Sequence, residues 1–302
     1  MPTTVRKAVI PAAGFGTRFL PVAKSVPKEM LPVVDKPVIQ YVVEEAAASG
    51  ITDMLFVISR GKRSLEEYFH PAPELESELA AKSKTAELQD IARLNRLANL
   101  HFVWQQEMRG LGDAVRHARA FAGGEPFAVL LGDTIVRPAS GHRPVTRQLI
   151  DVFESEGGSA IALEEVPMEK VSRYGIAGGD WERGGLLRVT RWVEKPAPDE
   201  APSRLAISAR YVFTPGIFDL LESTPPGKNG ELQLTDAMAG LLLREPMFGL
   251  RHGGCRFDIG NKIDFLKTNL LFALERPDTA PAVREFLQEL KLDTADAPKD
   301  PV

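Results

Sequence analysis

The 302-residue sequence has a single cysteine and no long apolar run. One cysteine, Cys255, cannot form a disulfide within the chain, which agrees with a reducing cytoplasm. No segment approaches the ~18 consecutive apolar residues of a membrane span, and the N-terminus lacks a signal-peptide pattern. We therefore expect a cytoplasmic protein with no membrane contact. Cys255 itself is expected to be a small buried side chain.

Signatures of zinc and nucleic-acid binding are also missing. The five histidines show no HExxH or HxxxH spacing and no CxxC pair exists, which argues against a zinc site. Any bound metal is expected to be a hard cation held by carboxylates and phosphates. The net charge of −4 provides no overall attraction to nucleic acid, so no nucleic-acid partner is expected.

A glycine-rich segment after the first apolar run is the most informative motif present. The run Lys7–Pro11 leads into Ala-Ala-Gly-Phe-Gly-Thr-Arg at residues 12–18. Two glycines allow a tight turn that brings backbone N–H groups close to an anion, and the guanidinium of Arg18 suits phosphate oxygens. Lys28, between two prolines, adds a second cation. The segment predicts a polyphosphate-binding loop at the end of a first strand.

This motif differs from two better-known phosphate-binding patterns. A dinucleotide fingerprint would need a third glycine at position 19, which is phenylalanine, and a P-loop would need Gly-Lys-Ser/Thr where Thr17-Arg18 stand. An ordinary tight turn with incidental charges is the alternative interpretation. Six cations and two anions between residues 5 and 37 favour the phosphate-binding interpretation.

Apolar runs alternate with helical patterns through the first half of the chain, which predicts an α/β fold with a mostly parallel sheet. Strands are expected at Ala8–Pro11, Met54–Ile58, Phe102–Trp104 and Phe127–Leu131. Apolar stripes between them are interpreted as the buried faces of helices. One stripe, from Leu88 to Leu97, predicts a long helix in the insertion Glu74–Asn99.

Longer strands and a helical C-terminus are expected in the second half. The strands are Ser159–Glu165, Leu186–Glu194, Leu205–Phe213 and Met247–Arg251, with glycine-rich turns at residues 178–179 and 184–185. Thr235 is the expected N-cap of a helix at Asp236–Arg244. Two apolar stripes after residue 262 predict two more helices, and the tail from Asp293 is expected to be disordered. We expect one α/β domain at residues 1–265 and an appendage of C-terminal helices and tail at residues 266–302.

Two aspartates follow predicted strands where a cation could be held. Asp133 comes after the strand Phe127–Leu131, at the carboxyl end where ligands bind in open parallel sheets. Asp258 lies at a strand-to-helix junction. Two carboxylates with phosphate oxygens and water are a normal environment for Mg²⁺. A turn cap at Asp133 and a helix N-terminal charge at Asp258 are the alternative interpretations.

Three polar positions further suit a sugar phosphate and a pyrimidine. The carboxylate of Glu194 could accept hydrogen bonds from vicinal hydroxyls, and the adjacent Lys195 could reach a phosphate. A charged strand end exposed to solvent is the alternative. Gln106 follows the strand Phe102–Trp104, and its amide has the donor and the acceptor that suit the imide edge of a pyrimidine.

Taken in order, these motifs resemble the sugar-phosphate nucleotidyltransferases. The N-terminal signature comprises residues 14–18, 27–32 and 35–37. Further matches follow at Ile39–Val43, Gly110–Gly112, Tyr174-Gly175, Val193–Pro196, Gln233–Asp236 and Phe257–Gly260. The resemblance covers about residues 5–275 and is strongest to the bacterial uridylyltransferases of the family.

The resemblance implies a fold, a reaction and an assembly. The fold would be of the nucleotide-diphospho-sugar transferase type, with a Rossmann-like mixed but mostly parallel sheet, added hairpin strands and a C-terminal helical appendage. The reaction would be a Mg²⁺-dependent attack of glucose 1-phosphate on the α-phosphorus of UTP, giving UDP-glucose and pyrophosphate. The family is typically homo-oligomeric, as dimers or tetramers, with its C-terminal helices in the contacts.

The resemblance also implies roles for individual residues. The expected nucleotide-binding residues are Ala13, Gly14, Gly16, Thr17, Arg18, Lys28, Gln106 and Gly112. Of these, Ala13, Gly14 and Gln106 should face uracil, and Arg18 and Lys28 should be catalytic together with Asp133. The expected sugar-phosphate residues are Gly175, Glu194 and Lys195, and the expected Mg²⁺ ligands are Asp133 and Asp258.

Two departures from the family pattern and two alternative functions remain. Asp133 follows Gly132 where relatives often have proline, and Ala23 stands where threonine is usual, but neither change removes a charge.

The motifs do not exclude dTTP or another sugar 1-phosphate as substrate. A non-catalytic regulatory paralogue would be expected to lose Thr17-Arg18 or Lys28, and this chain retains them.

Overall fold

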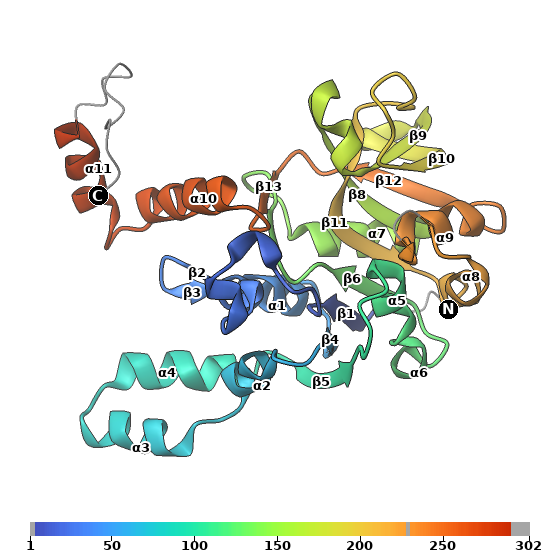
Figure 1. Ribbon diagram of the computed structural model, residues 1–302. Coiled ribbons are helices and arrows are strands. Elements are labelled where there is room, and N and C mark those ends of the chain that lie inside the picture. The colour runs from blue at the N-terminus through green and yellow to red at the C-terminus, as the bar shows by residue number, and fades with distance from the viewer. Residues whose placement is uncertain (1–3, 228–229, 291–302) are drawn as a thin grey trace.

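The computed structural model of the protein describes residues 4–227 and 230–290, and a nine-stranded mixed sheet forms its centre (Figure 1). The strand order is β5-β4-β1-β6-β11-β8-β12-β10-β9. These strands are β1 Lys7–Pro11, β4 Asp53–Ile58, β5 Asn99–Trp104, β6 Phe127–Leu130, β8 Ser159–Glu165, β9 Gly175–Trp181, β10 Leu186–Glu194, β11 Leu205–Phe213 and β12 Met247–Arg251. The tail from Asp293, predicted to be disordered, lies outside the described residues.

The first half of the sheet is parallel, as its apolar runs predict. β1 pairs in parallel with β4 and with β6, and β4 pairs in parallel with β5. Alternate side chains of β1 enter two different cores, because Ala8 and Ile10 face one side of the sheet and Val9 faces the other. Helices cover both faces, which explains why β1, β4 and β6 have nearly continuous apolar sequences, whereas the edge strand β5 has no fully buried residue.

The second half is largely antiparallel, so the prediction of a mostly parallel sheet holds only for the first half. β11 runs antiparallel to β6, β8 and β9, and β10 runs antiparallel to β9 and β12. The turn expected at residues 178–179 is wrong, because both glycines lie inside β9. A Cβ on Gly179 would stand 2.1 Å from the Arg188 carbonyl oxygen, so close strand packing explains that glycine. The hairpin turns at Gly184-Gly185, which have φ values of 73° and 78°.

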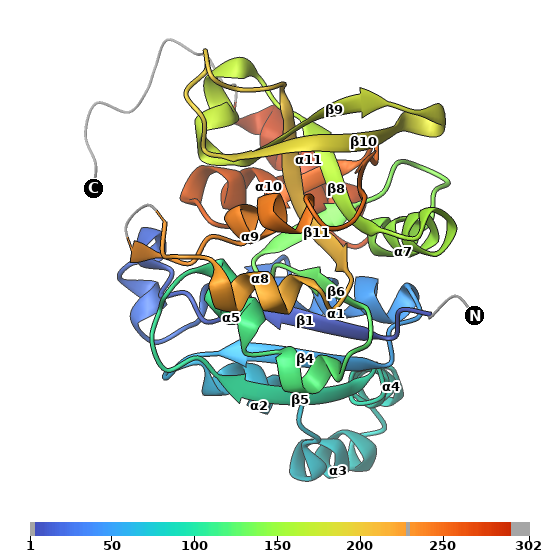
Figure 2. The ribbon, with the colours of Figure 1, turned by 90° about the vertical axis from the view of Figure 1, so that its right-hand side faces the viewer.

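Helices cover the two faces of the sheet in two groups. The helices are α1 Val38–Ala48, α2 Arg63–Phe69, α3 Pro73–Ala81, α4 Thr85–Leu94, α5 Leu111–Arg116, α6 Arg119–Ala122, α7 Val145–Glu156, α8 Ile217–Ser223, α9 Leu234–Leu241, α10 Lys262–Glu275 and α11 Ala280–Glu289. α1, α2 and α7 share the core that contains Ala8, whereas α5, α8 and α9 share the core that contains Val9. Figure 2 shows α5 and α8 in front of the sheet and α1 behind it.

The insertion Glu74–Asn99 forms two short helices rather than the one long helix predicted. α3 and α4 are separated at residues 82–84, where Ser83 has a φ of 55°. They extend beyond the β5 edge of the sheet (Figure 1). Neither helix contains a fully buried residue, so the stripe from Leu88 to Leu97 is half-buried and is not the core face we expected.

The C-terminal helices are confirmed, with different boundaries. α9 starts at Leu234, so Thr235 lies within its first turn and does not cap it. α10 starts at Lys262, where the Asn261 side chain accepts a hydrogen bond from the Asp264 backbone N–H at 2.9 Å. The division expected between residues 265 and 266 falls inside α10, which runs from Lys262 to Glu275.

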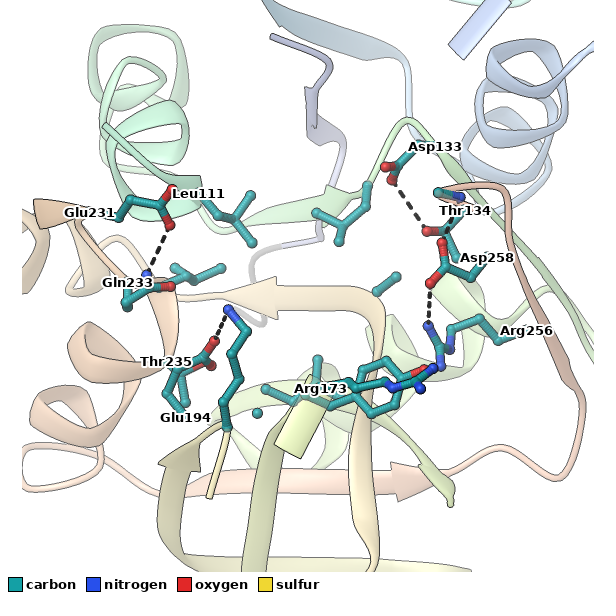
Figure 3. Close-up of a pocket in the computed structure, with 18 of the residues that line it drawn as sticks. Leu111, Asp133, Thr134, Arg173, Glu194, Glu231, Gln233, Thr235, Arg256 and Asp258 are labelled. Carbon is teal, nitrogen blue, oxygen red and sulfur yellow. Dashed lines mark hydrogen bonds and ion pairs between the residues drawn. The ribbon is translucent and has the colours of Figure 1, made fainter. Parts of the chain in front are cut away.

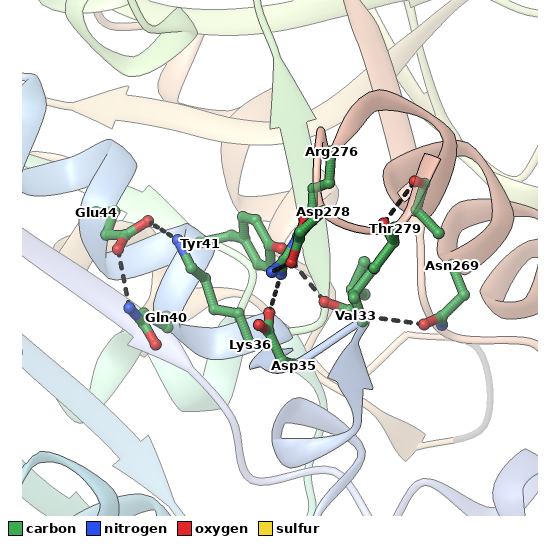
Figure 4. A network of polar contacts seen from close by, with 12 residues as sticks. Val33, Asp35, Lys36, Gln40, Tyr41, Glu44, Asn269, Arg276, Asp278 and Thr279 are labelled. Atoms are coloured by element: carbon green, nitrogen blue, oxygen red, sulfur yellow. Dashed lines mark hydrogen bonds and ion pairs between the residues drawn. The ribbon is translucent and has the colours of Figure 1, made fainter. Parts of the chain in front are cut away.

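Polar contacts fasten the appendage beside the N-terminal signature (Figure 4). Residues 32–37 form a small hairpin, β2 Pro32–Val33 and β3 Lys36–Pro37. The Val34 backbone N–H donates to the Asn269 side chain at 2.9 Å, and Arg276 pairs with both Asp35 and Asp278. The segment Asp35-Lys36-Pro37 thus has a structural role in this protein.

A second small sheet joins β7 Thr134–Arg137 to β13 Cys255–Asp258 in antiparallel register. Cys255 at its start is exposed, so the expectation of a buried cysteine is wrong. No helix of the described chain has both the length and the apolar character that a membrane crossing needs.

A buried polar cluster lies under the centre of the sheet. Arg210 is fully buried and pairs with Glu45 at 2.7 Å. Nearby, the Gly254 backbone N–H donates to Nδ1 of His252 at 3.1 Å, which leaves Nε2–H to donate to the Ser208 hydroxyl at 3.0 Å. This is the neutral form of the imidazole. Burial lowers the pKa of His252 to about 4.

The low pKa of His252 predicts that the protein loses stability in acid, and that His252→Gln reduces this loss. His252 takes up a proton near pH 6.5 in the unfolded chain and near pH 4 in the folded protein. Its contribution to the free energy of unfolding is therefore fully present above pH 6.5 and is lost as the pH falls from 6.5 to 4. By pH 5 the loss is on the order of 2 kcal/mol. Urea unfolding at pH 7 and pH 5 should show a smaller loss for His252→Gln than for the wild type. The exposed His70→Gln is the control, and equal losses in all three proteins would contradict the assignment.

Candidate active site

A cleft lies at the carboxyl ends of β1 and β6, as open parallel sheets predict. It consists of two adjoining hollows of about 440 and 480 Å³ that share Gly16, Thr17, Lys28 and Asp133. The glycine loop lines the first hollow, and the ends of β9 and β10 line the second. Two ligand groups joined through phosphates would therefore fit side by side.

The glycine loop leaves β1 in a fixed conformation. The Ala12 backbone N–H donates to the Val57 carbonyl at 2.8 Å, and the buried Ser59 hydroxyl donates to the Ala13 carbonyl at 2.6 Å. Gly16 has a φ of 65°, which favours glycine, and it precedes the short 3₁₀ turn Thr17–Phe19. The loop is thus held in place before any ligand binds.

Lys28 and Asp133 form an ion pair where the two hollows meet. Burial alone would lower the pKa of Lys28, but the carboxylates of Asp133 and Glu29 outweigh it and the pKa is raised. Burial alone would raise the pKa of Asp133, but the Lys28 ammonium outweighs it and the pKa is lowered. Both groups are therefore charged at neutral pH, and the lysine adjoins the glycine loop.

A second ion pair under Lys28 has no clear sequence signal. Glu29, next in the chain, is buried and accepts a hydrogen bond from Lys62 at 2.6 Å. Burial raises the pKa of Glu29, and Lys62 opposes that rise. The pair links the 3₁₀ turn Lys28–Met30 to the start of α2, so the backbone that carries Lys28 is held from below.

Asp133 and Asp258 are brought together by the small sheet of β7 and β13. Asp258 stands opposite Thr134 in the register, and the Ile259 backbone N–H donates to the Asp133 carbonyl at 3.2 Å. Figure 3 shows both carboxylates on the same side of the second hollow. One oxygen of Asp258 accepts the Gly260 N–H at 2.7 Å, and Arg256 lies 3.7 Å from the other.

This pair of carboxylates suits a hard divalent cation. In the described part of the chain, no three His, Cys, Asp or Glu side chains gather into a metal site. The remaining ligands would therefore come from phosphate oxygens and water, which is the coordination that Mg²⁺ prefers. The donor set is compatible with magnesium and lacks the nitrogen and sulfur ligands typical of zinc.

Gln105, rather than the expected Gln106, enters the loop hollow. Gln105 is buried at the end of β5 and lines the hollow with Ala13 and Gly14. Gln106 is exposed and lines a separate surface depression beside Trp104. Side chains alternate between the two faces of an extended chain, so Gln105 and Gln106 point in opposite directions. The apolar residues that precede them do not show which of the two enters the hollow.

Gly112 also lies outside both hollows. It is buried beneath the segment around Leu232, where an added Cβ would be 2.7 Å from the Leu232 carbonyl oxygen. The Gly112 N–H donates to that same oxygen at 2.9 Å. Its neighbours Gly110 and Leu111 line the cleft instead, so Gly112 acts by permitting close packing.

The expected sugar-phosphate residues meet at the ends of β9 and β10. Gly175 stands opposite Glu194 in the register, and an added Cβ there would be 2.9 Å from the Thr235 hydroxyl. Lys195 pairs with Glu194 at 3.0 Å and has a φ of 45°, a strained value for a residue with a side chain. In Figure 3, Glu194 and Thr235 lie across the second hollow from Asp133 and Asp258.

Two basic residues of this hollow were missed from the sequence. Arg256 pairs with Glu164, and its guanidinium lies 4.5 Å from the centre of the Tyr174 ring. Arg173 lines the same hollow and is exposed. Neither stands in a local pattern of its own, although Arg256 precedes the predicted ligand Asp258 by two positions.

Comparisons with known proteins show the family to which this chain belongs. A family described as nucleotidyl transferase matches residues 7–275. A UTP–glucose-1-phosphate uridylyltransferase of Streptococcus pneumoniae is 47% identical, with 96% of this chain and 97% of that protein covered. The Bacillus subtilis enzyme of the same name is 46% identical, with 95% and 97% covered.

Solved structures show the same relationship. The UTP-bound enzyme from Acinetobacter baumannii superposes with a TM-score of 0.88 at 39% identity, over 95% of this chain and all of that one. A UDP-glucose pyrophosphorylase complexed with UDP-glucose has a TM-score of 0.82 at 39% identity, over 90% of this chain. The chain therefore belongs to the nucleotidyl transferase family, in the group of the UTP–glucose-1-phosphate uridylyltransferases.

Proposed function

We propose that this protein makes UDP-glucose and pyrophosphate from UTP and glucose 1-phosphate. The observation that carries the proposal is the shared position of Lys28 and Asp133 between two hollows. A phosphate-binding loop lies on one side of them and a sugar-type set of polar groups lies on the other. One relative is bound to UTP and another to UDP-glucose, which supports UTP as a substrate and UDP-glucose as a product.

In this proposal the nucleotide occupies the loop hollow. Uracil faces Ala13, Gly14 and Gln105, which are grouped there. The triphosphate extends along Gly16 and Thr17 toward two cations, Arg18 and Lys28. Backbone N–H groups and permanent positive charge are the partners that phosphate oxygens need.

The sugar phosphate occupies the second hollow. The Glu194 carboxylate accepts hydrogen bonds from glucose hydroxyls. The absence of a side chain at Gly175 lets the Thr235 hydroxyl and the Glu194 carboxylate lie close to the backbone there. Lys195 supplies a positive charge for the phosphate. Arg173, which lines the same hollow, is a second cation of this kind.

The reaction needs positioning and charge neutralisation more than proton transfer. A phosphate oxygen of glucose 1-phosphate is already anionic, so no general base is required. It forms a new P–O bond at the α-phosphorus of UTP, the α–β bridging bond breaks, and its electron pair leaves with pyrophosphate. Lys28 and Arg18 balance the negative charge that moves toward the leaving group.

Asp133 and Asp258 are the residues that would hold Mg²⁺. A magnesium ion would contribute positive charge shared between the nucleotide and the sugar phosphate. In the free protein Lys28 satisfies the charge of Asp133, and the same ammonium lies within the phosphate-binding loop region. The two groups therefore keep each other charged and ordered until substrates arrive.

Removal of the Lys28 ammonium should impair the reaction strongly. Lys28→Ala should lower kcat/KM for pyrophosphate release by roughly 10² or more, because one preorganised cation at the reacting phosphates is lost. Lys24→Ala is the control, since this lysine is exposed in the same basic segment. A near-wild-type steady-state rate in Lys28→Ala would exclude Lys28 from the mechanism.

The activity itself is tested by a coupled pyrophosphate assay on the full chain. UTP with glucose 1-phosphate and Mg²⁺ should give turnover, and EDTA should abolish it. Preference for dTTP or for another sugar 1-phosphate would replace the proposed substrates with the alternative pair. No pyrophosphate from any pair would instead identify a non-catalytic paralogue.

We also propose that the C-terminal helices join copies of this chain. α10 is held to the body through Phe272, which is buried against Val33, Ile135 and Ile259. Its other side presents apolar side chains to solvent, including Ile263 at 59% and Leu266 at 63% exposure. An apolar face of this kind on a helix typically marks a contact surface.

A charge on that face should therefore lower the oligomeric state. Light scattering should give more than one chain for the wild type and a smaller assembly for Leu266→Glu, with an unchanged helical circular dichroism signal. Leu243→Glu is the matched control, because Leu243 is equally apolar and 88% exposed outside the appendage. A monomeric wild type would contradict the proposal.

A further inference from the structure

A buried carboxylate lies directly behind Gln105, whose side chain lines the loop hollow. Asp113, in the first turn of α5, is 2% exposed and takes no part in the proposed reaction. One of its oxygens accepts a hydrogen bond from the Gln105 amide nitrogen at 2.7 Å. Its other oxygen accepts from Arg116 at 2.5 Å. Each oxygen thus has its own donor, so the carboxylate is held in one orientation.

The chemistry of this contact determines which way the Gln105 amide points. A carboxylate only accepts hydrogen bonds, so the NH₂ group of Gln105 must be the end that faces Asp113. Its carbonyl oxygen, Oε1, is then directed away from Asp113. None of the hydrogen bonds among the described residues uses this oxygen, although Gln105 lines the loop hollow.

The rest of Gln105 is also fixed. Its backbone N–H donates to the Ile58 carbonyl at 2.8 Å, as an extension of the pairing between β4 and β5. Its NH₂ group lies 3.5 Å from the Gly110 carbonyl oxygen as well, a second acceptor on the same side. With both acceptors behind it, Gln105 presents an acceptor and no donor to the hollow.

We propose that Asp113 is a positioning residue that selects uracil over cytosine by fixing the orientation of the Gln105 amide. N3 of uracil carries a hydrogen and donates to an acceptor, whereas N3 of cytosine is itself an acceptor and is repelled by one. Thymine has the same N3–H as uracil, so Asp113 does not distinguish UTP from dTTP. This inference rests on the proposed function only in placing the pyrimidine ring beside Gln105.

The Asp113→Asn substitution tests the proposal with almost no change in volume. An asparagine can donate as well as accept, so it allows the Gln105 amide to turn and present its NH₂ group to the base. The ratio of CTP to UTP dissociation constants, measured by calorimetry on the full chain, should fall about tenfold or more. The ratio of dTTP to UTP dissociation constants should stay at its wild-type value.

Two further variants separate positioning from general damage. Asp219→Asn, an exposed aspartate of α8 paired with Arg119, should leave both ratios unchanged. In a Gln105→Ala background, Asp113→Asn should no longer alter the CTP-to-UTP ratio, because the side chain through which it acts is absent. Asp113→Ser replaces Asp113→Asn if the asparagine variant does not fold.

The outcomes distinguish this inference from the proposed function. The positioning role would be overturned if Asp113→Asn weakened the binding of UTP, dTTP and CTP equally. An unchanged ratio of the CTP and UTP dissociation constants would also overturn it. Because binding is measured, a wild type that prefers UTP to CTP but releases no pyrophosphate would refute the proposed reaction alone. A fall in the ratio that persists without Gln105 would also overturn the inference.

Discussion

The ion pair between Lys28 and Asp133 is the interaction on which the site depends. It joins the turn after the glycine loop to Asp133, which follows β6, and it lies where the two hollows of the cleft meet. Each partner would be destabilised by burial without the other, and together both remain charged. The buried Glu29–Lys62 pair beneath it and the β7–β13 sheet beside it hold these two charges in position.

The fold was predictable where local pattern and tertiary environment agree. The parallel strands β1, β4 and β6 are buried on both faces, so their sequences are nearly continuous apolar runs. Prediction failed where packing between distant segments determines the role of a residue. Gly179 looks like a turn residue but is required by a neighbouring strand, and the stripe from Leu88 to Leu97 covers only the edge of the body.

The site was predictable to the extent that its chemistry requires charged residues in recognisable motifs. The glycine loop, Lys28, Asp133, Asp258 and Glu194 were all found from the sequence, and all line the cleft. The glutamine that lines the loop hollow was missed by one residue, since Gln105 and Gln106 are chemically identical and only the strand geometry separates them. Gly112 and Asp113 show the same limit. Gly112 packs against the backbone at Leu232 and Asp113 bonds to the Gln105 side chain, and no spacing in the sequence indicates either contact.

A crystal structure of the protein with UTP and Mg²⁺ tests the central claim most directly. We expect the triphosphate along the glycine loop, with Nζ of Lys28 within about 3 Å of a phosphate oxygen and the uracil ring against Gln105. A triphosphate bound elsewhere, with Arg18 and Lys28 directed into solvent, would contradict it.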